Sequence, residues 1–334
     1  MRSKEPILFL IFNRLESTQK VFSQIKQYRP NKLYIASDGP RSFVSDENDL
    51  CEEIRNYILD NIDWECKVYT LFRASNLGCG RAVHEGINWF FEHEEQGIIL
   101  EDDCLPSFNF FEFASEMLHK YKDSFSVMHV SGVSMLPNEL RTSNTYYFSK
   151  YPSIWGWATW KSAWEKYDFS MNSMHDFDSV NPSLLDFNQY LYWKERFEMM
   201  KNKQFDTWDY QWLFSIWLNK GFSITPLNNL IINIGFSLEA NNTKNINSVA
   251  SNLTFENIPI TEKTHFIQND RFDDFTFYRL YKEINVSTEK ELKKIIIPFK
   301  NSISKKILSN NCTIRDKFYI IRQYLLSFVS KNNL

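Results

Sequence analysis

The chain has 334 residues and a formal net charge of −3 at neutral pH, which gives no electrostatic case for nucleic acid as its partner. Its length is enough to bury one large core or two smaller ones. Five scattered cysteines without a Cys-x-x-Cys pair argue against zinc and favour a reducing compartment. No apolar run approaches the ~20 residues of a membrane span, and the run at 7–12 is too short for a signal-peptide core, so we expect a cytoplasmic protein.

Apolar runs alternate with helical patterns through the first 135 residues. Short apolar runs predict buried strands, and apolar residues spaced by three and four predict helices. The predicted strands are 6–12, 32–36, 67–72, 97–100 and 127–133, and the predicted helices are 16–28, 49–61, 81–94 and 107–121. This alternation is typical of an α/β fold in which helices flank a largely parallel sheet.

Polar residues follow four of the predicted strands: Asn13-Arg14, Asp38, Arg73 with Asn76, and Glu101-Asp102-Asp103. In parallel sheets, ligands bind beyond the carboxyl ends of the strands. Each group alone is equally explained as a cap, a turn residue or a solvated charge. The convergence of all four on one edge of the sheet favours a binding site.

Three adjacent carboxylates, Glu101, Asp102 and Asp103, end the fourth predicted strand. Adjacent like charges at the edge of a core are costly unless a positive charge lies beside them. A divalent cation, Mg²⁺ or Mn²⁺, held by one or two carboxylates and a diphosphate is one solution. An acidic turn on the surface is the other, and these residues alone fit both. Because side chains alternate along a strand, we expect Asp102 to face away from the other two.

The loop from Asn76 to Arg81 contains Gly78 and Gly80 immediately before a predicted helix. Glycines let backbone N–H groups approach an anion, and the helix dipole favours negative charge there. Arg73 and Arg81 could add charge-assisted hydrogen bonds to a phosphate. The alternative is a flexible loop with solvated arginines.

These segments carry a family resemblance. The sequences Phe12-Asn13-Arg14, Ser37-Asp38-Gly39 and Glu101-Asp102-Asp103 in this setting resemble the N-acetylglucosaminyltransferase I type of GT-A glycosyltransferase and related bacterial surface-polysaccharide sugar transferases. The resemblance covers residues 6–240 and implies a GT-A fold, Rossmann-like, with a mixed acceptor-side half. It implies that Asp103 binds Mn²⁺ or Mg²⁺. The residues expected to bind the UDP-sugar donor are Phe12, Asn13, Arg14, Asp38, Arg73, Asn76, Gly78, Arg81, Glu101 and Asp102.

An aromatic segment contains Trp155, Gly156 and Trp157. Because the same family places a Gly-Trp element beside the sugar, we expect these three residues to form a wall of the sugar or acceptor site. The alternative is core packing, which we expect for Trp160 and Trp164.

The segment around Trp208 predicts a helix with Asp209 in its first turn. The resemblance implies that Asp209 is the general base that deprotonates the acceptor hydroxyl in an inverting transfer. The alternative is a carboxylate placed there by the helix dipole. Asp206 is the second candidate for the base. All six histidines lack partners at metal-binding spacing, so we expect them to be structural.

We expect three regions: a nucleotide-sugar half at 1–135, an acceptor-side half at 136–285 and a C-terminal extension at 286–334. Residues 287–334 hold ten basic and three acidic residues with interleaved apolar positions. Such a tail suits an anionic membrane surface, here the inner face, and equally a helical cap on the core.

From these features we expect a metal-dependent, inverting transferase that moves a hexose or N-acetylhexosamine from a UDP-sugar to a surface glycan or lipid-linked glycan. A sugar-1-phosphate nucleotidyltransferase is one alternative, but it would need a glycine-rich basic segment after the first strand, and residues 12–16 lack one. A non-catalytic carbohydrate-binding protein is the other, but it would have no need of the acidic cluster.

Overall fold

A computed structural model of the chain describes residues 4–140, 144–179, 185, 187–236, 249–255, 270–282 and 291. The chain divides into two compact units, residues 1–169 with 206–285 and residues 170–205 with 286–334. The boundaries expected at 135 and 285 remain predictions. The basic extension at 286–334 lies outside the described residues except for residue 291. No helix in the described ranges has the length and apolar character needed to span a bilayer.

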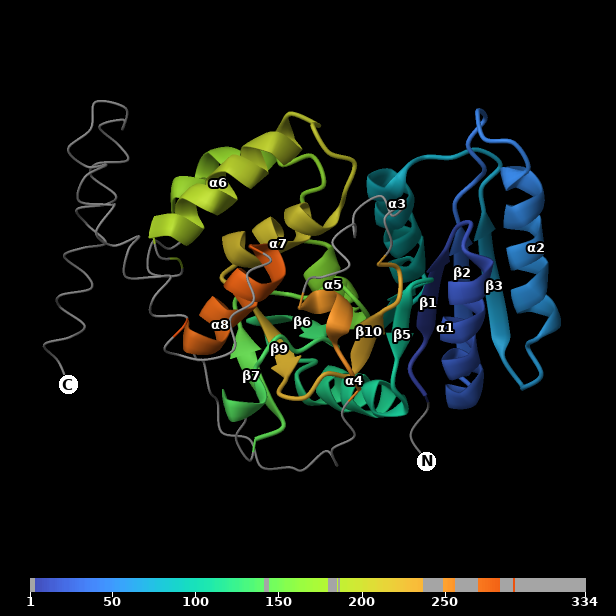
Figure 1. Ribbon diagram of the computed structural model, residues 1–334, viewed down its shortest axis with the longest axis horizontal. Coiled ribbons are helices and arrows are strands. Elements are labelled where there is room, and N and C mark those ends of the chain that lie inside the picture. Colours follow the sequence, from blue (N-terminus) through green and yellow to red (C-terminus); the bar gives the residue numbers. More distant parts are fainter. Residues whose placement is uncertain are drawn as a thin grey trace, which may run out of the picture. The chain divides into compact units, whose positions relative to one another are not determined.

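The first unit is organised around one large sheet. Its strands are β1 (Ile7–Ile11), β2 (Lys32–Ser37), β3 (Lys67–Phe72), β4 (Gln96–Glu101), β6 (Val127–Ser131), β7 (Tyr146–Ser149), β8 (Trp157–Trp160) and β9 (Phe222–Pro226). Their order across the eight-stranded sheet is β3-β2-β1-β4-β8-β6-β9-β7. Figure 1 shows β3, β2 and β1 on one side and β6, β9 and β7 on the other. β1 to β4 run parallel, whereas β8 runs antiparallel to both β4 and β6. Two further short strands, β5 (Cys104–Pro106) and β10 (Ile231–Asn233), pair antiparallel with each other.

Helices cover both faces of this sheet. The helices of the first unit are α1 (Leu15–Tyr28), α2 (Glu47–Asp60), α3 (Cys79–Phe91), α4 (Phe108–Lys120), α5 (Lys161–Trp164), α7 (Asp209–Leu218) and α8 (Asp270–Thr276). α1 contacts α2 and α4, whereas α3 lies against the Leu10 and Ala36 side chains. The predicted α/β class, a Rossmann-like and mostly parallel sheet flanked by helices, is therefore confirmed. The second unit contains α6 (Phe187–Lys201).

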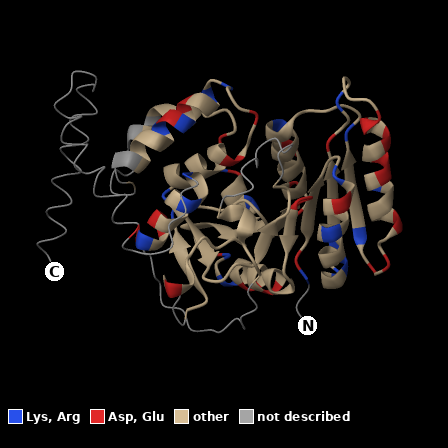
Figure 2. Ribbon diagram, viewed as in Figure 1, with Lys and Arg blue, Asp and Glu red and all other residues tan. Residues whose placement is uncertain are grey.

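The sequence of each element explains its place. β1 is buried at every position, as expected of a central parallel strand with helices on both sides. Phe9 and Ile11 belong to the same hydrophobic cluster as the buried residues of α1 and α4, whereas Leu10 points towards α3. α2 buries Ile54 and Ile58 and exposes most of the acidic residues that Figure 2 shows along it. This is the amphipathic pattern of a surface helix.

The strand register brings the four polar strand ends to one edge of the sheet. Ile11 is level with Ser37, Ser37 with Phe72, and Leu10 with Glu101. The segments that follow β1, β2, β3 and β4 therefore leave the sheet side by side. β8 runs the other way, so the residues before Trp157 lie at this same edge. The convergence predicted for these segments is confirmed, and we call this the carboxyl edge.

β8 was not predicted: Trp157 was expected in a wall of the sugar site, and Trp160 only as a core residue. Residues 157–160 instead alternate across the sheet and fill the space between β4 and β6. Bulky aromatic side chains suit such a strand. Only the four residues after it form a helical turn, α5.

Asp273 anchors α8 to the end of β7. Its side chain is completely buried, and its carboxylate accepts hydrogen bonds from the Ser149 hydroxyl and the Lys150 backbone N–H, at 2.5 and 3.3 Å. Burial raises the pKa of this carboxyl to about 7, although the positive charge of Lys150 opposes the increase. In the folded protein the group therefore releases its proton near neutral pH, whereas in the unfolded chain it does so near pH 4.

The folded state therefore binds the Asp273 proton more tightly than the unfolded state does. The stabilisation from this carboxyl is complete below about pH 4 and is lost as the pH rises through about 7, by on the order of a few kcal/mol. We expect Asp273→Asn to flatten the fall in melting temperature between pH 5 and pH 8. Asp123→Asn, at an exposed position that is not among the charges acting on Asp273, should leave that slope unchanged. An unchanged slope in Asp273→Asn would contradict this assignment.

Candidate functional site

The acidic cluster at the end of β4 is held by groups that follow β1. The Phe12 backbone N–H donates a 3.0 Å hydrogen bond to Oδ2 of Asp102. Nη1 of Arg14 lies 2.5 Å from Oδ2 of Asp103 and 3.6 Å from Oδ1 of Asp102. The expected alternation is wrong, because the strand ends at Glu101 and the next two residues form a turn that brings both aspartates to Arg14.

The cluster lacks positive charge. Burial and then the charges of Asp103 and Asp102 raise the pKa of the Glu101 carboxyl well above its usual value. Burial and the charge of Asp103 raise the pKa of Asp102 to about 7, although Arg14 opposes them. Burial alone lowers the pKa of the Arg14 guanidinium, but the two aspartates reverse this and raise it. One guanidinium thus serves three carboxyl groups, so a second cation would stabilise their ionised forms.

Asp209, the predicted base, lies in the neighbourhood of this cluster. It begins α7, where its carboxylate accepts a hydrogen bond from the Thr207 hydroxyl. Burial raises the pKa of the Asp209 carboxyl, and the bond from Thr207 opposes the increase. The negative charge of Asp209 is among the causes that raise the pKa of Glu101. The fold therefore brings residues from β4 and α7 within electrostatic range of each other.

The Cys79 thiol lies in the same neighbourhood. Burial raises its pKa well above the usual value, and Glu101 and then Asp209 raise it further. A thiol with a raised pKa is a poor nucleophile, so we assign Cys79 no nucleophilic role.

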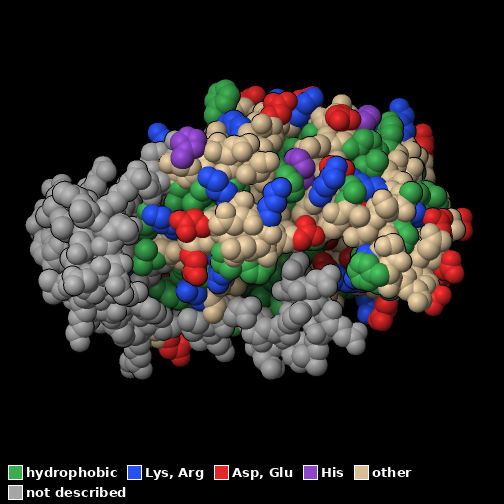
Figure 3. All heavy atoms as spheres, turned by 90° about the horizontal axis from the view of Figure 1, so that it is seen from above, with side chains coloured by type: hydrophobic (Ala, Val, Ile, Leu, Met, Phe, Trp, Pro, Cys, Tyr) green, Lys and Arg blue, Asp and Glu red, His purple; other side chains and the backbone are tan. Residues whose placement is uncertain are grey.

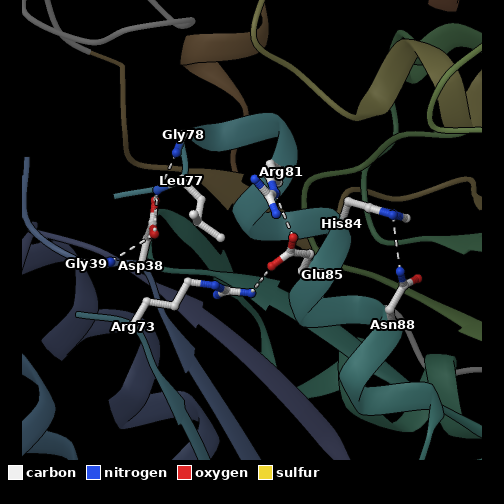
Figure 4. A network of polar contacts seen from close by, with 9 residues as sticks. All are labelled: Asp38, Gly39, Arg73, Leu77, Gly78, Arg81, His84, Glu85 and Asn88. Atoms are coloured by element: carbon white, nitrogen blue, oxygen red, sulfur yellow. Dashed lines mark hydrogen bonds and ion pairs between the residues drawn. The ribbon is translucent and has the colours of Figure 1, made fainter. Parts of the chain in front are cut away.

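Asp38 organises the loop that follows β3 (Figure 4). Its carboxylate accepts hydrogen bonds from the backbone N–H groups of Gly39, Leu77 and Gly78, at 2.9 to 3.2 Å. Burial raises the pKa of this carboxyl, and the bonds from Leu77 and Gly39 restrain the increase. Asn76 adds a 3.0 Å bond from its side-chain amide to the carbonyl oxygen of Gly39. Asp38 and Asn76 thus lie at the carboxyl edge as predicted, where they join the segments after β2 and β3.

The two arginines expected to meet phosphate share one carboxylate, that of Glu85 (Figure 4). Arg81 is 2.7 Å from it and Arg73 is 3.4 Å from it. The Arg73 side chain is 11% exposed and that of Arg81 is 63% exposed. Arg81 is thus the freer of the two to reach a ligand, and a role for either in binding the donor stays a prediction.

Gly78 and Gly80 are needed because the Asp206 side chain packs directly against them. The Gly80 backbone N–H donates a 2.9 Å hydrogen bond to Oδ1 of Asp206, at the N-terminus of α3. A Cβ atom at Gly78 would lie 2.3 Å from Asp206 Oδ2, and one at Gly80 would lie 2.7 Å from Oδ1. The predicted anion site therefore holds a carboxylate of the chain itself. Because Asp206 lies directly before Thr207 and Asp209, this contact also ties the start of α7 to α3.

Asn13 lies in a network that the sequence did not indicate. Its side-chain amide donates a 2.8 Å hydrogen bond to Glu47, a buried residue in the first turn of α2. Arg41 pairs with the same carboxylate at 2.5 Å, and its guanidinium carbon lies 5.6 Å from the centre of the Phe12 ring. Neither Arg41 nor Glu47 follows a predicted strand directly, so only the fold shows that they belong to this edge.

The expectation that Trp157 lines a sugar site is wrong. Its side chain is 0% exposed and stacks on His129 and Trp208, with ring centres 4.9 and 5.5 Å apart. Burial lowers the pKa of His129 to about 3, so this histidine is neutral and structural, as expected. Trp160 and Trp164 are buried as predicted.

Trp155 and Gly156 lie at the carboxyl edge. The Trp155 ring is partly exposed and meets that of Phe236 edge to face, with ring centres 5.6 Å apart. Gly156 has φ +61° and lies so close to Ile231 that a Cβ atom would be 2.4 Å from Cδ1. Gly235, next to Phe236, lies against Asp103, where a Cβ atom would be 2.2 Å from Oδ2. Trp155 is thus linked through Phe236 and Gly235 to the acidic cluster.

The carboxylates of the acidic cluster fit a divalent cation only if another group, such as a diphosphate, supplies further ligands. In the described ranges, no three or more His, Cys, Asp or Glu side chains are grouped so as to hold a metal ion. Carboxylate oxygens are nevertheless the donors that Mg²⁺ and Mn²⁺ prefer, and a diphosphate can complete the coordination. On the face seen in Figure 3, basic and acidic side chains of the described residues are interspersed, without the positive stripe that follows a nucleic-acid backbone.

The contact between Asp206 and α3 can be tested by removing its acceptor oxygens. Loss of a helix cap costs about 1 kcal/mol, so Asp206→Ala should lower the free energy of unfolding by about that amount in a urea titration. Asp206→Asn keeps an oxygen for the Gly80 N–H and should lose less than half as much. Equal losses in the two variants would show that the oxygen does not act as a cap.

A scan against protein-family models and a search of curated proteins find no match. Among solved structures, apo UDP-glucose pyrophosphorylase aligns over 68% of this chain and 93% of its own, with 10% identity and a TM-score of 0.33. HddC from Yersinia pseudotuberculosis aligns over 49% and 80%, with 10% identity and a TM-score of 0.29. The glycosyltransferase GlyE from Streptococcus pneumoniae TIGR4 aligns over 59% and 44%, with 8% identity and a TM-score of 0.29. Likenesses this slight carry no argument, so the function of this chain has to be inferred from its own residues.

Proposed function

We propose that this protein is a GT-A glycosyltransferase that moves a hexose or N-acetylhexosamine from a UDP-sugar to a glycan acceptor, with inversion and with Mn²⁺ or Mg²⁺. The observation that supports the proposal is the acidic turn at the carboxyl edge, where Arg14 is paired with both Asp102 and Asp103. The charge of Asp209 is near enough to this turn to contribute to the raised pKa of Glu101. A cluster of carboxylates with too little positive charge suits a cation and a diphosphate. A further buried carboxylate nearby suits the removal of a proton.

Each residue has a part in this scheme. Asp209 accepts the proton of the acceptor hydroxyl as that oxygen attacks the anomeric carbon of the donor. Its raised pKa brings it closer to the value at which a carboxylate is an efficient base at neutral pH. Asp206 is a positioning residue, because it fixes the start of α7 against α3. Trp155, which is partly exposed beside Phe236, is the remaining candidate for a sugar-stacking wall.

Asp103, with Asp102 beside it, is the residue that would hold the cation. A bound cation there would offset the negative charge that develops on the departing UDP. Arg14 is the positive group that pairs with both of these aspartates. The acceptor is a surface glycan or a lipid-linked glycan in this proposal, and residues 287–334 would provide any contact with a membrane surface.

The binding step is tested by calorimetric titration of UDP with and without Mn²⁺. We expect Mn²⁺ to increase the affinity for UDP at least tenfold, a difference of about 1.4 kcal/mol, because the cation links the diphosphate to Asp103. Asp103→Asn should abolish most of this increase. Asp123→Asn is the matched control, since this exposed carboxylate precedes β6 at the opposite edge of the sheet. UDP binding without any effect of Mn²⁺ would contradict metal dependence.

The chemical step is tested by UDP release from UDP-glucose and UDP-N-acetylglucosamine, with water as the acceptor. Asp209→Asn should lower the rate by about 10²- to 10⁴-fold, the range expected for loss of a general base. Its affinity for UDP in the presence of Mn²⁺ should stay within threefold of the original. Asp123→Asn should keep the full rate. A rate unchanged in Asp209→Asn would remove this residue as the base.

The same materials distinguish the two rivals. A sugar-1-phosphate nucleotidyltransferase would convert UDP-glucose and pyrophosphate into UTP and glucose 1-phosphate, whereas a glycosyltransferase would not. A carbohydrate-binding protein would bind no UDP, and its binding of glycans would not change in Asp103→Asn.

A further inference from the structure

We propose that Arg14 is the resident counter-ion of Asp103 and excludes free divalent cations, so that the cation enters only together with the nucleoside diphosphate. The ligand of this edge is then a metal–nucleotide complex. This inference rests on the proposed function, since it assigns the form in which the donor binds.

The geometry of Asp103 is the first step. Its Oδ2 atom lies 2.5 Å from Nη1 of Arg14, and its Oδ1 atom lies 3.4 Å from the sulfur of Cys104, which donates to it. Gly235 approaches the same carboxylate so closely that no Cβ atom would fit. Both oxygens of Asp103 therefore already have a partner in the chain, and the stronger partner is Arg14.

The neighbouring residues do not supply the ligands that a free cation would still need. In the parts of the chain that are described, no other His, Cys, Asp or Glu side chains complete a group of three ligands. A free cation would thus have to displace a guanidinium and would still find fewer than three protein ligands. The exchange becomes favourable when a diphosphate brings further oxygen ligands to the cation and, at the same time, new acceptors for Arg14.

Arg14 can leave without disturbing the core. Its side chain is 38% exposed, whereas those of Asp102 and Asp103 are 9% and 12% exposed. It is the residue immediately before α1, and its side chain makes no capping hydrogen bond to that helix. Movement of this side chain requires only rotation about its own bonds, which is fast compared with domain motions.

The test measures bound Mn²⁺ directly, by the electron paramagnetic resonance signal of free Mn²⁺, without and with UDP. The wild-type protein should bind Mn²⁺ at least tenfold more weakly without UDP than with it. Arg14→Gln should bind Mn²⁺ without UDP at least tenfold more tightly than the wild type, because two unit charges this close interact strongly. The Mn²⁺ affinity of Arg14→Gln should also increase less on addition of UDP than that of the wild type.

Lys20→Gln is the matched control, because it removes one positive charge from α1 that pairs with Glu16 instead. It should bind Mn²⁺ as the wild type does. If Arg14→Gln does not fold, Arg14→Lys replaces it and should bind free Mn²⁺ at least threefold more tightly than the wild type, since an ammonium lacks the guanidinium fork. Equal Mn²⁺ affinity in the folded Arg14 variant and the wild type would overturn the inference.

The two proposals fail in different ways. If no protein binds UDP but the Arg14 variant still binds Mn²⁺ more tightly, the counter-ion role stands and the transferase function falls. If UDP and Mn²⁺ bind together in the wild type but the Arg14 variant gains no affinity for free Mn²⁺, the function stands and the counter-ion role falls.

Discussion

The arrangement of this edge depends on one charge balance, that of Arg14 against Asp102 and Asp103 at the end of β4. Parallel strands with level ends make the balance possible, because residues after β1 and β4 leave neighbouring strands in register. The balance is incomplete, since Glu101 also lies there and its pKa is raised well above the usual value. A site that holds more carboxyl groups than cations favours partners that carry positive charge.

A second constraint is the use of backbone N–H groups by internal carboxylates. Asp38 and Asp206 together accept hydrogen bonds from residues 77, 78 and 80, so they hold the loop between β3 and α3 from two sides. This loop then has a fixed shape before any ligand arrives. Sites that are ordered in advance lose less entropy on binding than sites that must be ordered by their ligand.

Much of the fold followed from the sequence, because long apolar runs leave little choice. β1 to β4 and the helices between them lie close to their predicted positions, and the carboxyl edge gathers the four polar strand ends as expected. The residues of the acidic cluster were also foreseen, since adjacent carboxylates are visible in any sequence. The pairing of these carboxylates with Arg14 was not foreseen, because a turn such as that at 102–103 has no hydrophobic periodicity in the sequence.

The misassigned residues share a cause. Trp157 was expected at a sugar site because its neighbours resemble those of a family, but burial in β8 depends on pairing with β4, about sixty residues earlier. The glycines at 78 and 80 indicated an approaching anion, yet Asp206 supplies it from 126 residues away. A local sequence pattern can show that an anion or an aromatic partner is expected beside a residue. It does not show whether a ligand or a distant part of the chain supplies that partner.

The pairing of β5 with β10 extends this point to the order in which the molecule matures. Cys104 meets Asn233, and this contact brings Gly235 against Asp103. Contacts between segments so remote form slowly, because a large loop must close first. A ribosome that has released only the first half of the chain has therefore produced β1 to β4 before Gly235 can lie against Asp103. The acidic turn at 102–103 is therefore covered by Gly235 only after the second half of the chain has been made.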